Sequence, residues 1–167
     1  MGAEATFERK IQLAISVSRI NGWSIAGFAG LCTIVVLLMG DWLGFLIGLS
    51  VTAAGVMELK GHRLLVERKE NAFVWLAGSQ AFLMIVLWAY AFYQLIRFDP
   101  DNPWAMFSPE FKKLILSVNP DVYLVEAMLR FTVQATYLAL ILAVFIYQGG
   151  LCLYYFSRKK YLYPEVE

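Results

Sequence analysis

The stretch from Gly22 to Met57 constrains this chain most, because its 36 consecutive residues carry a single charge, Asp41. One helix of that length would extend about 54 Å at about 1.5 Å per residue, whereas the hydrocarbon core of a bilayer is about 30 Å thick. The run must therefore fold back on itself. Gly40 and Asp41 supply the turn, since glycine accepts a positive φ and aspartate can bond the backbone that follows it. We expect a transmembrane hairpin.

The composition agrees with a membrane protein. Hydrophobic residues make up 60% of the chain, charged residues only 16%, and the mean hydropathy is +0.61. Four spans with short connections occupy nearly all of the 167 residues, so we expect one membrane domain over 1–167 with no separate soluble catalytic domain. The net charge of +1 and the lack of a continuous basic stripe argue against nucleic acid as a partner.

The pattern predicts an all-α integral membrane protein with four transmembrane helices at about 22–40, 42–65, 72–97 and 122–157. Residues 5–20 place apolar side chains at helical spacing, which predicts a separate amphipathic helix at the membrane interface. The polar segment 99–121 is expected to be a loop. Ser108, Pro109 and Glu110 are typical of a helix start, so we expect a short helix over 109–118 within that loop.

Lysine and arginine are distributed unequally between the two ends of the predicted spans. Ten fall in the N-terminal segment, the loop between the second and third spans, and the C-terminal segment, against three on the opposite side. The positive-inside rule therefore predicts both termini in the cytoplasm, 99–121 as an extracytoplasmic loop, and an inner or plasma membrane location. Aromatic residues near the span ends, among them Trp104 and Tyr155, are expected in the interfacial belts.

Small residues at four-residue spacing indicate how these helices associate, because close backbone approach is a main source of attraction between helices in lipid. The candidates for helix packing are Gly22, Ala26, Gly30, Gly44, Gly48, Ala135, Ala139 and Ala143. Two interpretations stay open: packing within one four-helix bundle, and an interface between copies of the chain.

Glu58 is the strongest candidate for a functional polar residue, because it directly follows an apolar run and an ionisable group there is costly unless paired or hydrated. His62 lies one helical turn further on, and a carboxylate with an imidazole at this spacing can pass protons or hold a cation. The alternative is a boundary ion-pair cluster of Glu58 and His62 with Lys60 and Arg63.

Glutamines within the predicted spans are a second set of candidates. Gln80 and Gln134 would either line a polar pathway or make hydrogen bonds between helices.

Catalytic and cofactor signatures are missing from the sequence. A single histidine excludes the usual metal sites with two or three imidazoles and bis-histidine haem ligation, so we expect no metal and no cofactor. The sequence contains no GxSxG, Walker or HExxH motif. We expect the protein not to be an enzyme.

Three hypotheses for function follow. The first is a non-enzymatic accessory, scaffold or assembly subunit of a membrane complex, whose partners are the lipid bilayer and either another membrane protein or further copies of the chain. The second is a homo-oligomeric channel or transporter for protons or cations that uses Glu58. The third is a membrane enzyme acting on lipid, whose acid and base groups would come from Glu58, His62 or the carboxylates of 99–121.

Overall fold

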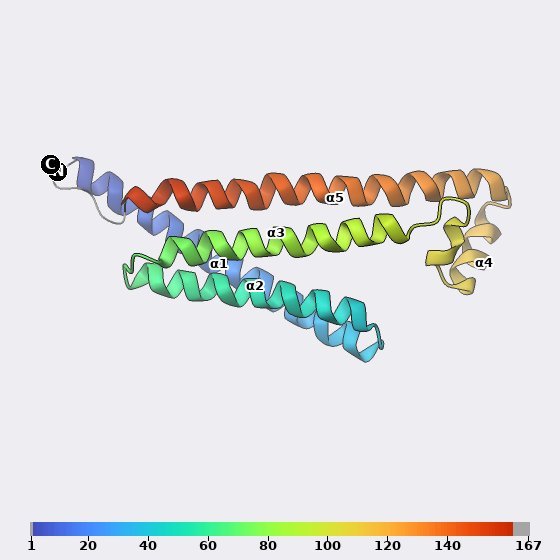
Figure 1. Ribbon diagram of the computed structural model, residues 1–167, viewed down its shortest axis with the longest axis horizontal. Helices are drawn as coiled ribbons and strands as arrows, with labels where there is room; N and C mark the ends of the chain where they lie inside the picture. The colour runs from blue at the N-terminus through green and yellow to red at the C-terminus, as the bar shows by residue number, and fades with distance from the viewer. Residues whose placement is uncertain (1, 162–167) are drawn as a thin grey trace. The chain divides into compact units, whose positions relative to one another are not determined.

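The computed structural model describes residues 2–161, and side chains at 8–105, 107–159 and 161. All regular secondary structure in its described part is helical (Figure 1). The four long helices are α1 (Gly2–Leu38), α2 (Trp42–Val66), α3 (Ala72–Arg97) and α5 (Val122–Arg158). The short ones are α4 (Pro109–Val118) and the 3-10 turns η1 (Pro103–Met106) and η2 (Lys159–Tyr161).

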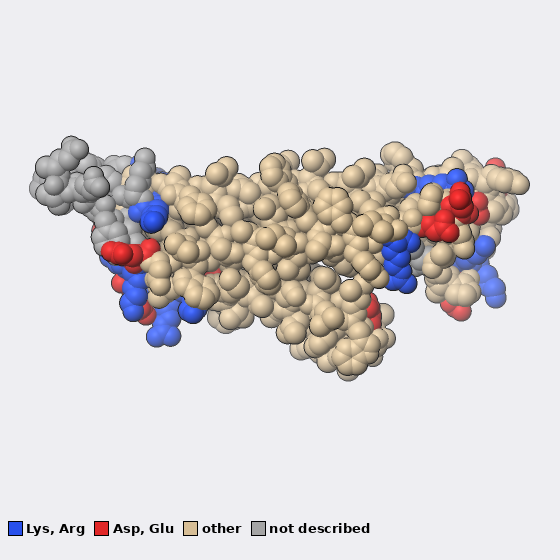
Figure 2. All heavy atoms as spheres, viewed as in Figure 1, with Lys and Arg blue, Asp and Glu red and all other residues tan. Residues whose placement is uncertain are grey.

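All four long helices are long and apolar enough to cross a membrane, over Glu8–Leu38, Trp42–Val66, Ala72–Arg97 and Val122–Arg158. On the face that Figure 2 shows, lysine, arginine, aspartate and glutamate gather near helix ends, and the helix middles are covered by other residues. The structure thus fits the predicted all-α membrane protein. α2, α3 and α5 lie close to the expected boundaries, whereas α1 begins well before the expected residue 22.

The turn between α1 and α2 confirms the predicted hairpin. Gly40 has a φ of 77°, a left-handed conformation that favours glycine. Asp41 caps α2, and its Oδ1 accepts a hydrogen bond from the backbone N–H of Gly44 at 3.0 Å. Figure 1 shows α1 and α2 lying side by side in opposite directions from this turn.

A separate amphipathic helix over 5–20 is not supported, because α1 runs without interruption from Gly2 to Leu38. Ile11, Ala14 and Ser18 on this stretch are buried within the protein. The apolar periodicity therefore marks a face covered by neighbouring helices and not one resting on a membrane interface. Gly22 lies within this continuous helix and packs against α2, where an added Cβ would lie 2.9 Å from Leu59 Cδ2.

The chain divides into two compact units. The first, called unit 1, holds residues up to Leu87 and from Val144 onward, so it contains α1, α2, the first part of α3 and the last part of α5. The second, called unit 2, holds Trp88–Ala143, with the rest of α3 and α5 and the whole of α4.

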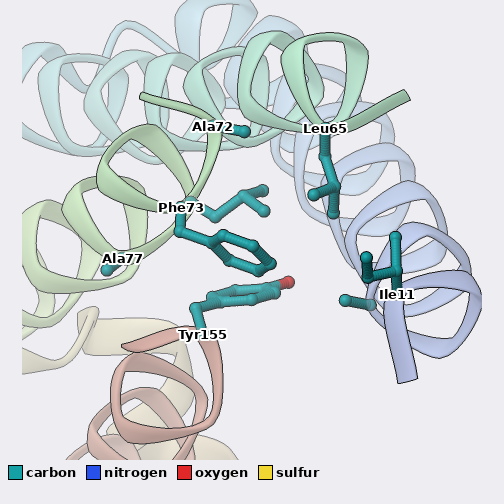
Figure 3. Packing of buried hydrophobic residues seen from close by; sticks show 8 residues of the cluster. Ile11, Leu65, Ala72, Phe73, Ala77 and Tyr155 are labelled. Atoms are coloured by element: carbon teal, nitrogen blue, oxygen red, sulfur yellow. The ribbon is translucent and has the colours of Figure 1, made fainter. Parts of the chain in front are cut away.

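In unit 1, a buried cluster joins all four long helices. It comprises Ile11, Ala14, Leu65, Ala72, Phe73, Leu76, Ala77 and Tyr155. Figure 3 shows the Phe73 ring of α3 beside the Tyr155 ring of α5, with Ile11 and Leu65 facing them from α1 and α2. Glu8 and Arg68 form an ion pair of 2.7 Å that joins α1 to the loop after α2.

In unit 2, a short segment folds against α5. Trp104 of η1 is buried, and its indole N–H donates to Glu126 Oε1 at 2.9 Å. The burial of Trp104 corrects its assignment to an interfacial belt. α4 covers the range expected for a short helix, and the N-cap Ser108 Oγ accepts from Phe111 N at 3.2 Å.

Candidate functional site: a buried carboxyl in unit 1

Glu58 lies at the centre of the most concentrated polar contacts in unit 1. Its side chain is 0% exposed although it sits on a predominantly apolar helix, α2. About 16 residues separate it from Trp42, which places it about 24 Å along α2 from the hairpin turn. An isolated buried charge in a low-dielectric environment is strongly unfavourable, so the surroundings of this carboxyl decide what it can do.

Three neutral donors from three other helices satisfy this carboxyl. Asn21 Nδ2 of α1 and Gln80 Nε2 of α3 each donate to Glu58 Oε2 at 2.7 Å. The Tyr155 hydroxyl of α5 donates to Glu58 Oε1 at 2.7 Å. The carboxyl thus joins α2 to α1, α3 and α5 at one point, and we call these four residues the Glu58 cluster.

Polar contacts extend from the cluster toward the protein surface. The exposed Tyr147 of α5 donates from its hydroxyl to Asn21 Oδ1 at 3.2 Å. On the other side, Gln80 Oε1 is buried and has no hydrogen-bond partner within the described part of the chain. The cluster is therefore linked to the protein surface through Tyr147 and contains one buried acceptor, Gln80 Oε1, without a donor.

His62 is not part of the cluster. Its Nδ1 lies 3.1 Å from Ser18 Oγ on α1, whereas the Glu58 contacts go to other residues. The structure therefore does not bring Glu58 and His62 together as a hydrogen-bonded pair, although they are one turn apart on α2.

The neighbouring basic residues also have other partners. Lys60 Nζ lies 3.7 Å from the centre of the Trp75 ring, a cation-π contact, and Arg63 Nε pairs with Glu67 Oε1 at 3.1 Å. The proposed boundary cluster of Glu58, Lys60, His62 and Arg63 is therefore wrong.

Outside the spans, hydrogen bonds from Lys69 and Arg63 lower the pKa of Glu67.

The other predicted polar residues lie apart in sequence and setting. Gln80 belongs to the Glu58 cluster, while Gln134 is exposed on α5 in unit 2.

The predicted packing residues fall into two groups. On α1 and α2 they lie in the hairpin: Gly48 faces Thr33, Ala26 faces Gly55, Gly44 lies beside Val36 and the Asp41 cap, and Gly30 has only an ordinary contact with Thr52. On α5, Ala135 is half-buried, whereas Ala139 and Ala143 are exposed.

Sequence reasoning missed two of the four members of the cluster. Asn21 was outside the predicted first span, which began one residue later, although an amide within a continuous helix was a signal available in the sequence. Tyr155 was assigned to an interfacial belt, but it is 0% exposed. Nothing in the local pattern distinguishes a tyrosine at a membrane interface from one that donates to a buried carboxyl.

Gly55 and Gly61 were also missed as packing positions. An added Cβ at Gly55 would lie 2.8 Å from Ala26 Cα, and one at Gly61 would lie 2.8 Å from Leu76 Cγ.

Among the described residues, no group of three or more histidine, cysteine, aspartate and glutamate side chains is arranged to hold a metal ion. What the Glu58 cluster can do chemically is hold four helices together and accept or release a proton at one carboxyl. No protein-family model, no curated protein and no solved structure matches this chain.

Proposed function

We propose that this protein is a non-enzymatic accessory, scaffold or assembly subunit of a membrane complex, and that α5 provides a face for its partner. The observation that carries the proposal is the exposure of Ala139 and Ala143 on a helix long and apolar enough to span a membrane. Small residues at four-residue spacing allow another helix to approach closely. Comparable positions on α1 and α2 lie inside the hairpin, whereas Ala139 and Ala143 on α5 are exposed.

Gln134 is also exposed on α5, but it lies outside the alanine face. At about 100° per residue it is about 140° around the helix from Ala139. It is therefore not part of the surface that we propose for the partner.

Site-specific photo-cross-linking in native membranes tests this proposal. A photoreactive residue at position 139 should yield a protein adduct of one defined mass. The matched control replaces Leu138, which is also exposed but lies about 100° around the helix. Lipid adducts alone at 139, or the same protein adducts from both positions, would contradict a partner on the alanine face.

The orientation of the subunit is part of the proposal. The lysine and arginine distribution supports cytoplasmic termini, a cytoplasmic loop between α2 and α3, and α4 in an extracytoplasmic loop of an inner or plasma membrane. Single cysteines at Glu70 and Asn102, introduced with Cys32 and Cys152 replaced by serine, should react from opposite sides with a membrane-impermeant maleimide. Labelling of both from the same side would overturn this orientation.

A second candidate function is a homo-oligomeric channel or transporter for protons or cations. It is favoured by the hydrogen-bonded series from exposed Tyr147 through Asn21 to Glu58. Tyr147→Phe removes the outer hydroxyl without changing the cluster itself, and Tyr93→Phe, at another exposed tyrosine, is its control. Proton or cation flux in vesicles should fall for Tyr147→Phe alone, and no flux from the wild type would exclude this class.

A further inference from the structure

An open groove of about 850 Å³ lies within unit 1, formed by α1 with parts of α2, α3 and α5. Its lining on α1 extends from Asn21 to Leu31, which corresponds to about 15 Å along the helix. Most lining residues are apolar, such as Phe28 and Leu83, and the volume lies in the range of small-molecule sites.

One polar lining residue, Gln148, carries an unsatisfied acceptor. Gln148 is 6% exposed, and its Oε1 has no hydrogen-bond partner among the residues that the structure describes. A buried carbonyl oxygen without a donor is costly, so a donor from a bound molecule would be favourable. The other polar lining residues are Asn21, Ser24 and Tyr147, and none of the lining residues carries a charge. An uncharged hydroxyl or amide donor therefore suits this site.

The groove also has open space beside a glycine. A Cβ added at Gly27, which lines the groove on α1, would meet nothing within 4 Å. A larger side chain there would occupy the groove without forcing the helix backbones apart.

We propose that this groove binds one uncharged membrane lipid, with an acyl chain along α1 and a headgroup hydroxyl that donates to Gln148 Oε1. The groove lies among helices long enough to cross a membrane, so acyl chains are the medium around it. A second copy of the chain suits it less, because the backbone donors of a membrane helix are already bonded within that helix. The amide oxygen of Gln148 is itself buried, so the lipid hydroxyl would reach it once the soft terminal torsion of this side chain turns the oxygen into the groove.

Native mass spectrometry of the full chain in mild detergent tests the hydrogen bond. The probes are dioleoylglycerol and the methyl ether of its free hydroxyl, which differ only in the ability to donate. We expect the wild type to bind dioleoylglycerol about tenfold more tightly than the ether, as a hydrogen bond of about 1.4 kcal/mol would give. Gln148→Leu should bind both lipids with equal affinity, near the wild-type affinity for the ether.

A second pair of variants tests the groove itself. Gly27→Phe should lower the binding of both lipids at least tenfold. The matched control is Gly78→Phe, because Gly78 is also an exposed helix glycine with nothing within 4 Å and does not line the groove. Helix content measured by circular dichroism should be the same in both variants. Three results would each overturn the proposal. The first is equal lipid binding by the two phenylalanine variants, and the second is no preference of the wild type for the hydroxyl lipid. The third is that Gly27→Phe loses a dimer while no lipid binding is seen.

Discussion

At the scale of single residues, the Glu58 cluster explains how a predominantly apolar helix accommodates a carboxyl that is fully buried. The Glu58 carboxyl is not held by an ion pair among the described residues. Its three hydrogen-bond donors are the neutral side chains of Asn21, Gln80 and Tyr155. Removing one partner of a buried polar contact costs more than the contact itself contributes, because the remaining group stays desolvated. Each donor is therefore expected to matter for stability.

Tyr155→Phe tests this expectation with the smallest change. It keeps the ring that packs beside Phe73 but leaves Glu58 Oε1 without its donor, so we expect a loss of about 1 to 3 kcal/mol in the free energy of unfolding. Equilibrium unfolding in mixed micelles measures this. Tyr154→Phe is the control on the same helix, and a loss of equal size in both variants would show that the hydroxyl of Tyr155 has no special role.

At the scale of the helices, close packing in the α1–α2 hairpin depends on a few glycines. At Gly55 an added Cβ would lie 2.8 Å from the Cα and 2.9 Å from the Cβ of Ala26, so the two backbones would have to separate. This contact was not predicted, since the pattern of small residues does not reveal which glycine faces which neighbour.

Gly55→Leu should therefore destabilise the hairpin by about 1 to 3 kcal/mol, the usual cost of overpacking. Gly78→Leu is the control, because a side chain there meets nothing within 4 Å. Equilibrium unfolding of both variants in the same micelles gives the comparison. Equal stability of the two leucine variants would contradict close contact between α1 and α2 at Gly55.

The start of α4 makes a prediction about pH. Hydrogen bonds from its own backbone N–H and from the Ser108 side chain lower the pKa of Glu110. A carboxyl with a lowered pKa in the folded state stabilises that state above its ordinary pKa, and this contribution disappears as the pH falls through the lowered value. Protection factors of amides in the first turn of α4, which correct for the intrinsic effect of pH on exchange, should fall over that range in the wild type. In Glu110→Gln this fall should be absent, and an unchanged pH dependence would refute the role of Glu110.

At the scale of the whole molecule, the sequence was informative where hydropathy and length decide the outcome. The four long helices and the Gly40 and Asp41 turn follow from where a chain can remain in lipid and where it must reverse. The continuity of α1 did not follow, because an apolar face looks the same whether lipid or protein covers it. The partners of Glu58 did not follow either, because they depend on how four helices are aligned in space.

The proposed role in a membrane complex depends on what covers α5. The exposed alanine face favours a partner within the membrane, whereas unit 1 already satisfies its central carboxyl from within the chain. Self-association and association with a different membrane protein both satisfy this proposal, and they differ in the composition of the complex.

The most direct test is the native mass and composition of the wild-type chain extracted from its membrane in mild detergent, together with Ala139→Trp and Leu138→Trp. We predict a complex heavier than the 19.0 kDa chain that survives in the wild type and in Leu138→Trp. Ala139→Trp should dissociate it, because the indole prevents close approach of a partner helix. A wild-type chain that is strictly monomeric, with no component that can be cross-linked to it, would contradict the account.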